Sequence, residues 1–377
     1  MGRDDGGKHG TYCSRMGWLG RRVMRVLLAG GGSGGSSTPV LAVAQELRRR
    51  GPCDFLYVGT ATGPERELVS RLNIPFKSVE TGKLRRYWSL ENLTDVFRVP
   101  IGLAQSLRLV AAFRPNVAFA AGGFAAVPPL LAASLLRIPS VIHQQDVEPG
   151  LANRILAPFA TAITLTFPES IAHFPRKKAT VTGNPVREEI LAGSRVEGLR
   201  LFGLRDDLPV VLATGGGTGA LGLNRLVAAV GPALAGKCQV LHITGRGKQV
   251  DAPAVGAHYR QVEFLAEGMG HALAAADLVI SRAGLSTLTE IAALRKPSIL
   301  IPMPDSHQNA NARVFSEGGA AIVLQQGMLN AEELASYVLG LLGDAERRRT
   351  LGEQARALIP PGAECRIADW LERSARR

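Results

Sequence analysis

Short apolar runs alternate with longer amphipathic segments along the chain, from residue 24 to about residue 325. The short runs are rich in β-branched residues and bounded by Gly or Pro, which is typical of strands buried on both faces. Such strands, alternating with helices, predict a parallel sheet with helices on both sides. The predicted strands are Arg25–Ala29, Phe55–Val58, Val117–Ala121, Ser140–His143, Ala162–Thr166, Pro209–Thr214, Gln239–Thr244, Leu278–Ser281, Ser298–Pro302 and Ala321–Leu324, and the predicted helices include Val40–Arg50, Leu103–Phe113, Asn224–Leu234 and Thr287–Leu294.

Two glycine-rich turns repeat one arrangement in the two halves of the chain. Residues 30–35 follow the first predicted strand, and residues 215–220 follow the strand that opens the second half. Each turn has the GxGxxG/A spacing that lets backbone N–H groups and a helix N-terminus approach a pyrophosphate. Tight packing of strand against helix is the alternative reason for such glycines. Two matched copies predict two Rossmann-like domains that face each other, with a boundary near Gly183-Asn184-Pro185.

Neither turn completes a known nucleotide motif. A nicotinamide site needs an acidic residue where the second strand ends, but the second strands here end at Thr60 and Arg246. No Gly-Lys-Ser/Thr follows either glycine cluster, so the P-loop pattern is absent. The sequence therefore disfavours a dehydrogenase and a P-loop NTPase.

Composition narrows the class of partner. The 377 residues, 46% hydrophobic and 20% charged, fit a two-domain globular chain with a large core. Lys and Arg number 44 against 32 Asp and Glu, a formal charge of +12 that favours an anionic partner. Residues 1–23 contribute +3 of it, from five cations minus two acids, and have no apolar signal-peptide core. We interpret them as a disordered leader or a misplaced start upstream of Met24.

Cysteine usage and hydropathy exclude several further classes. The four cysteines are far apart and lack metal-ligand spacing, which favours a reducing cytosol over a disulfide framework or a structural zinc site. No apolar stretch is long enough to cross a membrane. The chain also lacks helix-turn-helix, RNP-like and zinc-finger patterns, so nucleic acid is not an expected partner.

The longer motifs resemble one known family, in family order. They read LLAGGGSGGSSTPVLAVAQEL, RPNVAFAAGGFAAVPPLLAA, PSVIHQQDVEPGLANRIL, VTGNPVR, LATGGGTGALGLN, FLAEGM, ADLVISRAGLSTLTEIAALRKPSILIPMP and DSHQNANA. Across about residues 24–375 the chain resembles the MurG-type N-acetylglucosaminyltransferases of peptidoglycan synthesis, which have the GT-B fold. The resemblance implies an α/β protein with two Rossmann-like, doubly wound parallel-sheet domains around a cleft.

The same resemblance implies a division of labour and a reaction. Residues 24–186 would receive the acceptor and associate with the membrane, residues 187–359 would bind UDP-GlcNAc, and a C-terminal helix in 360–377 would return to the first domain. The implied reaction is inverting transfer of GlcNAc from UDP-GlcNAc to the 4-hydroxyl of MurNAc in lipid I, which gives lipid II.

By this resemblance, the donor site lies in the second domain. Glu290 corresponds to a carboxylate that accepts hydrogen bonds from the ribose hydroxyls, and a capping box with Thr287 is the local alternative. Arg187 corresponds to an arginine near the phosphates, and a solvated linker arginine is its alternative. The other implied donor residues are Gly216, Gly217, Thr218 and Gly219 at the diphosphate, Phe264 and Leu265 at the uracil, and His307, Gln308 and Asn311 near the sugar. The family usually has Ser-Gln where this chain has Gly217-Thr218. A hydrogen bond from those family side chains to the diphosphate is therefore not expected here.

The acceptor side departs further from the family pattern. The residues implied there are Gly32, Ser33, Gly34, Gly35, Gly122, Gly123 and Asn153. The usual histidine of the first glycine loop is Ser36, and the usual His-Glu-Gln-Asn is His143-Gln144-Gln145-Asp146. The usual tyrosine after Gly123 is Phe124. One carboxylate is thus lost at position 144 and another appears at position 146.

Inverting transfer requires a base for the acceptor hydroxyl, and the serine at the family's catalytic position, Ser36, is a poor one. Asp146 is the predicted base, with His143 second and Glu148 third. A turn or N-cap carboxylate ahead of residues 150–156 is the open alternative for Asp146. Backbone N–H groups of residues 215–219 and Arg187 are expected to stabilise the departing UDP. The donor half has no Asp-x-Asp motif, so we expect no obligatory metal and no other cofactor.

Residues 83–114 interleave cations with large apolar side chains. The cations are Lys83, Arg85, Arg86, Arg98, Arg108 and Arg114, and the apolar residues include Tyr87, Trp88, Leu93, Phe97, Ile101 and Leu103. This mixture predicts an interfacial patch on an anionic leaflet and a peripheral location on the cytoplasmic side of the cell membrane. A helix with its apolar side toward the core and solvated cations is the alternative.

Two further functions stay open at this stage. The altered loop of the first domain fits a GT-B transferase with another acceptor. Ser36 and Gln144 also fit a protein that binds UDP-GlcNAc with little or no turnover.

Overall fold

The structure is a computed structural model that describes residues 23–31, 34–63, 65–81, 91–251, 256–265 and 267–376, without the side chains of residues 34, 91–97 and 257. The predictions for Gly32, Ser33, Lys83, Arg85 and Arg86, like the leader over residues 1–22, fall outside the described residues.

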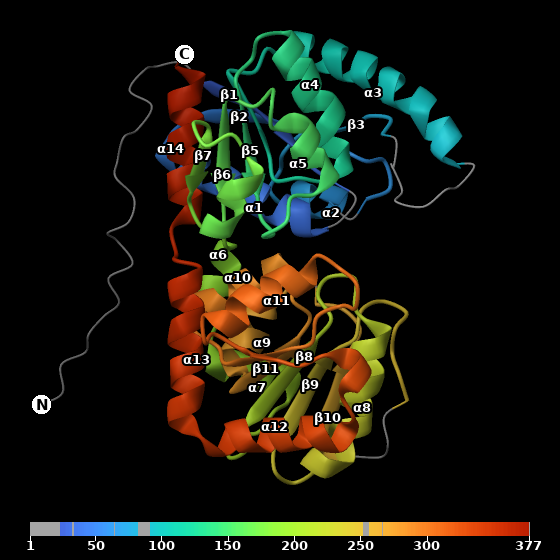
Figure 1. Cartoon of the computed structure of the whole chain (residues 1–377), viewed down its shortest axis with the longest axis vertical. Helices are drawn as coiled ribbons and strands as arrows, with labels where there is room; N and C mark the ends of the chain where they lie inside the picture. Colours follow the sequence, from blue (N-terminus) through green and yellow to red (C-terminus); the bar gives the residue numbers. More distant parts are fainter. Residues whose placement is uncertain are drawn as a thin grey trace, which may run out of the picture.

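Among the described residues, seven parallel strands form the first sheet, in the order β3-β2-β1-β4-β5-β6-β7 (Figure 1). They are β1 (Met24–Ala29), β2 (Cys53–Gly59), β3 (Phe76–Ser78), β4 (Val117–Ala120), β5 (Ser140–Gln144), β6 (Ala162–Leu165) and β7 (Ala179–Val181). The chain reverses its direction of progress between β1 and β4, which pair from Val26 opposite Val117 onward. Ligands of such sheets bind at this switch point, beyond the carboxyl ends of the strands.

The described part of the second half forms a six-stranded parallel sheet in the order β10-β9-β8-β11-β12-β13. Its strands are β8 (Val210–Thr214), β9 (Gln239–Ile243), β10 (Tyr259–Val262), β11 (Leu278–Ser281), β12 (Ser298–Leu300) and β13 (Ile322–Val323). The switch point is again at the opening strand, between β8 and β11. The prediction of two Rossmann-like parallel-sheet units is therefore confirmed.

Helices cover both faces of each sheet. The α-helices are α1 (Gly34–Arg50), α2 (Glu65–Arg71), α3 (Glu91–Phe113), α4 (Val127–Leu135), α5 (Leu151–Leu156), α6 (Glu188–Leu191), α7 (Arg195–Phe202), α8 (Leu221–Leu234), α9 (Met269–Ala275), α10 (Leu285–Ala293), α11 (Gln308–Glu317), α12 (Ala331–Gly343), α13 (Ala345–Leu358) and α14 (Ala363–Ala375). Four 3₁₀ turns are described as well: Phe124–Ala126, Pro168–His173, Gly256–His258 and Gln326–Met328.

Burial of the central strands explains why the apolar pattern predicted them. Every residue of β4, β5, β6, β8, β9 and β11 is buried, so these strands are apolar with little alternation. The short strands β3, β7 and β10 were missed, because they carry partly exposed polar residues at the sheet margins. Helices α1 and α8 begin several residues before the predicted starts, inside or just after the glycine turns.

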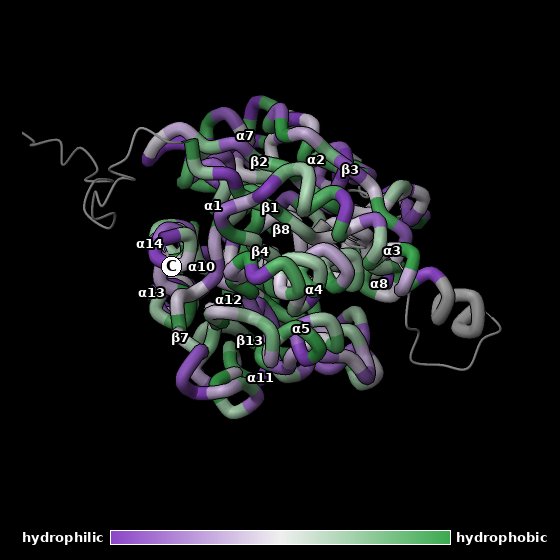
Figure 2. Tube along the Cα trace, turned by 90° about the horizontal axis from the view of Figure 1, so that it is seen from above, coloured by the Kyte–Doolittle hydropathy of each residue, from purple (hydrophilic) through white to green (hydrophobic). Residues whose placement is uncertain are grey.

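The chain passes between the two sheets twice. It leaves the first sheet after β7 through residues 182–187, and α13 and α14 bring it back along one flank, opposite α3 (Figures 1 and 2). Helix α14 packs against α1 and strands β4, β5 and β6 of the first sheet. Arg50 of α1 fastens the two helices, because its Nη1 lies 2.6 Å from Asp369 Oδ1 and its Nη2 donates to the Cys365 carbonyl at 2.8 Å.

The carboxyl ends of the two sheets face each other across the interface. Ser286 at the start of α10 donates to the Gly35 carbonyl at the start of α1, at 3.3 Å. Val147 and Phe167 of the first half are buried in one apolar cluster with residues of α10, α11 and α13. The loops that follow β1, β4 and β5 therefore lie opposite those that follow β11 and β12.

Candidate active site

An ion pair between Arg187 and Glu290 marks the centre of the predicted donor site. Arg187 Nη2 lies 2.7 Å from Glu290 Oε1, and a second guanidinium nitrogen bonds to the more exposed Glu189. Burial raises the pKa of Glu290, and Arg187 opposes that rise. The Nε of Arg187 is buried with no partner among the described residues. A half-buried cation beside a buried carboxylate suits a ligand that carries both phosphate and hydroxyl groups.

The start of α10 removes the local alternative for Glu290. The helix is capped by Gly284 without any side-chain hydrogen bond, so Thr287 lies inside the first turn and forms no capping box. Glu290 lies one turn further on and is 7% exposed. A carboxylate buried at this depth needs partners, and Arg187 supplies only one of them.

The second glycine turn presents backbone N–H groups toward the same edge of the sheet. Gly216 and Gly219 have φ of +81° and +70°, conformations that side chains rarely adopt. Gly219 donates its N–H to Gly216, whereas Gly217 and Thr218 donate theirs to nothing in the described structure. Helix α8 begins two residues later, at Leu221. Free N–H groups at a helix N-terminus form an anion site.

Phe264 and Leu265 follow β10 at the predicted uracil position. Leu265 packs partly into an apolar cluster of the second domain, which holds its backbone in place. Phe264 is more exposed, and the guanidinium of Arg246 lies over its ring, 4.4 Å from the centroid. Arg246 occupies the strand end where a nicotinamide enzyme has its acidic residue.

Asn311 joins the two domains, and this position changes its predicted role. Its Nδ2 donates to Asp146 Oδ1 at 2.8 Å and to the Ala283 carbonyl at 3.1 Å, and its Oδ1 accepts from Val147 N–H at 3.0 Å. The side chain is fully buried. With both amide hydrogens used, Asn311 supports the interface and does not present a donor to the sugar. The exposed His307 caps α11, and Gln308 accepts from Met303 N–H at 3.0 Å.

Gln144 explains the exchange of carboxylate and amide on the acceptor side. Its Nε2 donates to the carbonyls of Asp146 and Glu148, at 2.7 and 3.1 Å, and its Oε1 accepts from Asn153 Nδ2 at 2.7 Å. A glutamate could not donate to either carbonyl. Gln144 therefore shapes the loop after β5 and holds Asp146 half-buried against Asn311. The N-cap of α5 is Gly150, so the N-cap alternative for Asp146 is wrong.

His143 lies in the core, away from any substrate. It is completely buried, its Nδ1 lies 3.0 Å from Thr164 Oγ1, and its Nε2 lies 2.8 Å from Asn184 Oδ1. Burial lowers the pKa of the His143 imidazole to about 4. Because both ring nitrogens are occupied and the ring is neutral, the prediction of His143 as an alternative base fails on geometry.

A hydrogen-bonded chain continues from His143 into the second domain. Asn184 Nδ2 donates to Thr289 Oγ1 at 2.7 Å, and Thr289 donates to the Leu285 carbonyl at 2.8 Å. Thr289 precedes Glu290. The buried chain therefore fixes the linker residue Asn184 and helix α10 relative to β5.

The first glycine loop packs tightly against the loop after β4. Gly123, at φ +84°, has room for no side chain, since an added Cβ would lie 2.6 Å from the Gly31 carbonyl oxygen and 3.1 Å from Ser36 Oγ. Ser36 is 6% exposed. Beside Gly122 lies Asn153, whose Oδ1 is buried with no partner among the described residues. The predicted acceptor residues that the structure describes are thus neighbours.

Comparisons with known proteins identify the family of the chain. The glycosyltransferase family 28 N-terminal domain model matches residues 26–165, and the C-terminal domain model of that family matches residues 210–360. A UDP-N-acetylglucosamine–N-acetylmuramyl-(pentapeptide) pyrophosphoryl-undecaprenol N-acetylglucosamine transferase of Lachnoclostridium phytofermentans is 41% identical over 322 residues, 84% of this chain and 90% of that protein. The protein of the same name from Clostridium perfringens is 35% identical over 355 residues, 93% of this chain and 98% of the relative.

The chain belongs to the MurG-type glycosyltransferases. The crystal structure of Acinetobacter baumannii MurG superimposes with a TM-score of 0.71 at 26% identity, covering 93% of this chain and all of that one. The calicheamicin glycosyltransferase CalG4, at 17% identity and a TM-score of 0.69, shares the fold alone. The GT-B fold expected from the sequence is therefore confirmed.

Two further residues beside the candidate site were not identified from the sequence. Asn184 lies in the quoted VTGNPVR motif, but its role depends on partners from β5 and α10. Lys248 donates to the carbonyls of Thr218 and Gly219 in the second glycine turn. The sequence feature that could have pointed to Lys248 is its position just after β9, at the edge of the sheet where the donor site lies.

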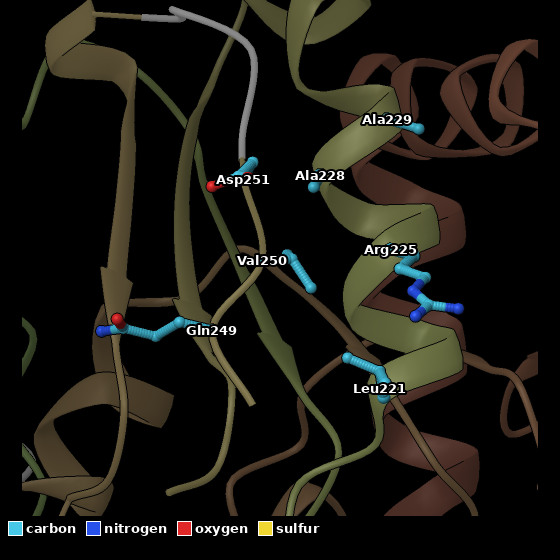
Figure 3. A pocket seen from close by; sticks show the side chains of 7 residues that line it. All are labelled: Leu221, Arg225, Ala228, Ala229, Gln249, Val250 and Asp251. Carbon is cyan, nitrogen blue, oxygen red and sulfur yellow. The ribbon is translucent and has the colours of Figure 1, made fainter. Parts of the chain in front are cut away.

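Other features of the molecule lie apart from this site. An open depression of about 490 Å³ beside α8 is lined by Leu221, Arg225, Ala228, Ala229, Gln249, Val250 and Asp251, none of them a predicted site residue (Figure 3). Within the described ranges, no three His, Cys, Asp or Glu side chains group as a metal site would. Over the same residues, no helix is long and apolar enough to span a membrane.

Proposed function

We propose that this chain transfers GlcNAc from UDP-GlcNAc to the 4-hydroxyl of MurNAc in lipid I, with inversion, to form lipid II. The observation that carries the proposal is the partly buried Arg187–Glu290 pair. It lies at the carboxyl edge of the donor sheet, near free N–H groups and opposite the acceptor loops. The names of the two relatives describe the same donor and acceptor. Lipid I carries a polyprenyl diphosphate, which also suits the chain's +12 charge.

The donor would bind with its ribose on Glu290 and its diphosphate at the second glycine turn. In this arrangement the ribose hydroxyls donate to the Glu290 carboxylate, and the unused Nε of Arg187 becomes available to a phosphate oxygen. Phe264 and Leu265 would lie beside the uracil ring. His307 and Gln308 remain proposed contacts near the sugar. Asn311 does not contact the sugar in this arrangement and instead donates a hydrogen bond to Asp146.

Departure of UDP would be assisted chiefly by fixed dipoles. As the bond between sugar and phosphate breaks, negative charge accumulates on the diphosphate. The N–H groups of Gly217 and Thr218, the N-terminus of α8 and the Arg187 guanidinium can stabilise that charge without reorganising. We propose that this chemistry requires no metal ion and no other cofactor.

Asp146 is the proposed base for the acceptor hydroxyl. It lies half-buried on the loop after β5, between the two domains, and Asn311 holds one of its carboxylate oxygens. The second oxygen is left to receive a proton. Ser36 has no ionisable group and lies buried against Gly123, so it is better suited to shaping the acceptor loop. Glu148, exposed on the same loop, stays the second candidate now that His143 is excluded.

Association with the cytoplasmic face of the cell membrane is the remaining part of the proposal. Within the described half of the predicted patch, Leu103 and Phe113 pack partly against the core of the first domain, as the alternative interpretation required. Ile101 is 51% exposed, and the neighbouring Arg98 and Arg108 are exposed on the same helix, α3. The exposure of Ile101 and Arg108 supports contact between this helix and a leaflet that carries anionic lipids.

Radiolabelled UDP-GlcNAc, offered with lipid I, tests the proposal. Formation of labelled lipid II supports it. Transfer to a different acceptor alone would indicate another GT-B transferase, and saturable UDP-GlcNAc binding without transfer would indicate a binding protein. Either of the last two results contradicts the proposal. Ser36 and Gln144 favour the binding-only alternative only if they disable catalysis, and the contacts of Gln144 show that it has a structural role instead.

A further inference from the structure

Two turns of the donor domain interlock beneath the proposed diphosphate position. One is the second glycine turn, residues 215–219, and the other is the turn after β9, residues 244–248. Gly219 has no space for a side chain, because an added Cβ would lie 2.1 Å from the Thr244 carbonyl oxygen. A Cβ on Gly245 would lie 2.5 Å from the Gly219 Cα. The backbones are therefore in direct contact.

A single lysine ties these turns together. Lys248 Nζ donates to the Thr218 carbonyl at 2.7 Å and to the Gly219 carbonyl at 3.0 Å. Each carbonyl belongs to a peptide unit whose N–H is on the following residue, so the ammonium group fixes the orientation of two consecutive peptide planes. The N–H groups of these two units belong to Gly219, which donates to the Gly216 carbonyl, and to Ala220, the N-cap of α8. Lys248 therefore fixes the turn immediately after the free N–H groups of Gly217 and Thr218.

The turn that carries Lys248 is itself rigidly held. The buried Asn224 of α8 donates to the Thr244 and Lys248 carbonyls, both at 2.8 Å. The Oδ1 of Asn224 lies 3.1 Å from His242 Nε2, and His242 Nδ1 lies 2.6 Å from the Tyr259 hydroxyl. The Lys248 side chain thus extends from a backbone segment that is held in place to the glycine turn.

Without that tie, the glycine turn has few restraints of its own. A Cβ on Gly217 would meet nothing within 4 Å, and one on Gly216 would meet only Thr287 Oγ1, at 3.8 Å. Glycine backbones with so few neighbours have a large conformational freedom to lose when a ligand binds. A restraint that is already present in the free protein reduces that cost.

We propose that Lys248 is a positioning residue for donor binding: it orients the glycine turn so that its N–H groups face the diphosphate of the nucleotide sugar. This inference rests on the proposed function, because it presupposes a diphosphate ligand at the turn. It differs from the assignment of the turn itself, since Lys248 acts through the Thr218 and Gly219 carbonyls. The ammonium charge also adds to the positive potential at the N-terminus of α8.

The test compares Lys248→Met with the wild-type chain in binding UDP and uridine, by calorimetry. UDP and uridine share the base and ribose and differ in the diphosphate. We expect the dissociation constant of UDP to rise about tenfold in K248M, and that of uridine to change less than about twofold. Lys248→Arg should recover most of the UDP affinity, because a guanidinium can donate to both carbonyls.

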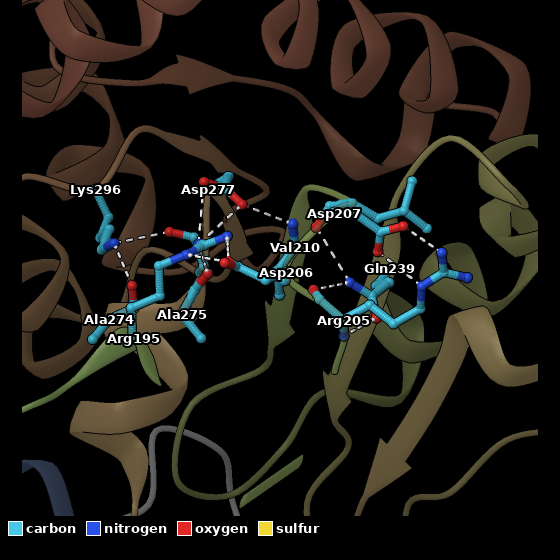
Figure 4. Close-up of polar contacts among 12 residues, drawn as sticks. Arg195, Arg205, Asp206, Asp207, Val210, Gln239, Ala274, Ala275, Asp277 and Lys296 are labelled. Atoms are coloured by element: carbon cyan, nitrogen blue, oxygen red, sulfur yellow. Dashed lines mark hydrogen bonds and ion pairs between the residues drawn. The ribbon is translucent and has the colours of Figure 1, made fainter. Parts of the chain in front are cut away.

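Lys296 provides the matched control. It donates to the Ala274 and Ala276 carbonyls at 2.9 and 2.8 Å, in the same domain but at the opposite end of the sheet, near the start of β11 (Figure 4). Lys296→Met should lower thermal stability and leave the ratio of the two dissociation constants unchanged. Equal effects of K248M on UDP and uridine, or no effect on either, would overturn the inference. Failure of the wild type to prefer UDP would contradict the proposed function instead.

Discussion

At the scale of single residues, Glu290 and Arg187 were each assigned to the donor from a motif of their own, one to the ribose and the other to the phosphates. The structure adds that the two side chains form an ion pair, which the separate motifs did not predict. The sequence pointed to Asp146 as a base, but the hydrogen-bond partners of Gln144 and Asp146 could not be predicted from it, since they include Asn153 and the distant Asn311. The apparent movement of a carboxylate from position 144 to position 146 places at 144 an amide that holds the loop, and at 146 the carboxylate that we propose as the base.

Gln144→Glu tests this interpretation of the loop. The substitution removes two partly buried hydrogen bonds to backbone carbonyls and places a carboxylate against them, which should cost about 2–3 kcal/mol of unfolding free energy. Urea denaturation measures the change. Gln145→Glu is the comparison, because Gln145 donates to one carbonyl only, that of Ala121 at 3.1 Å. If Q144E were no less stable than Q145E, Gln144 would not have the role described.

At the scale of elements, local patterns predicted the strands and the turns, but not the contacts between turns. The glycines at 216, 217, 219 and 245 are all visible in the sequence. Only the fold shows that Gly219 and Gly245 touch, whereas Gly217 and Gly247 have open space. Helix starts were placed late for a related reason: glycine has low helix propensity, and tertiary packing overrides it in α1.

Comparing Gly245→Ala with Gly247→Ala separates the effect of the contact between the two turns from the effect of backbone strain. Both residues lie in the turn after β9 with positive φ, +89° and +66°, so alanine strains the backbone at either site. Only at Gly245 would the new Cβ meet backbone, at the Gly219 Cα. We expect G245A to weaken UDP binding about tenfold and G247A to weaken it less than about twofold, as measured by calorimetry. Equal losses in the two variants would show that the turns are not mechanically linked.

At the scale of the whole molecule, each domain has a completely buried neutral histidine that depends on polar partners. His143 bonds to Asn184 in the linker, and His242 bonds to Asn224 beneath the donor turn. The sequence predicted two facing domains from two glycine turns. It did not predict that buried amides and histidines would join strands, linker and helices, because partners in such networks are far apart in the chain.

These histidines predict how stability depends on pH. Burial lowers the pKa of each to about 4, from 6.5. The unfolded chain therefore takes up protons between pH 6.5 and pH 4 that the folded chain does not. Stability should be fully present above about pH 6.5 and fall as the pH decreases toward 4, by up to about 3 kcal/mol for each histidine.

Urea denaturation at a series of pH values measures this dependence. His143→Gln should reduce the slope between pH 6.5 and pH 4 by about one proton, and His307→Gln, at an exposed position, serves as the control. A slope in H143Q identical to that of the wild type would contradict the assignment of a buried neutral imidazole.

We propose that the altered acceptor side is a working active site with Asp146 as its base. The most direct test is the single-turnover rate of GlcNAc transfer from UDP-GlcNAc to lipid I, in the wild type and in Asp146→Asn. Asparagine can still pair with Asn311 through its side-chain oxygen, so the loop should remain in place. We predict that D146N transfers about 100-fold more slowly while its affinity for UDP stays within about twofold. A D146N rate equal to that of the wild type would contradict the account.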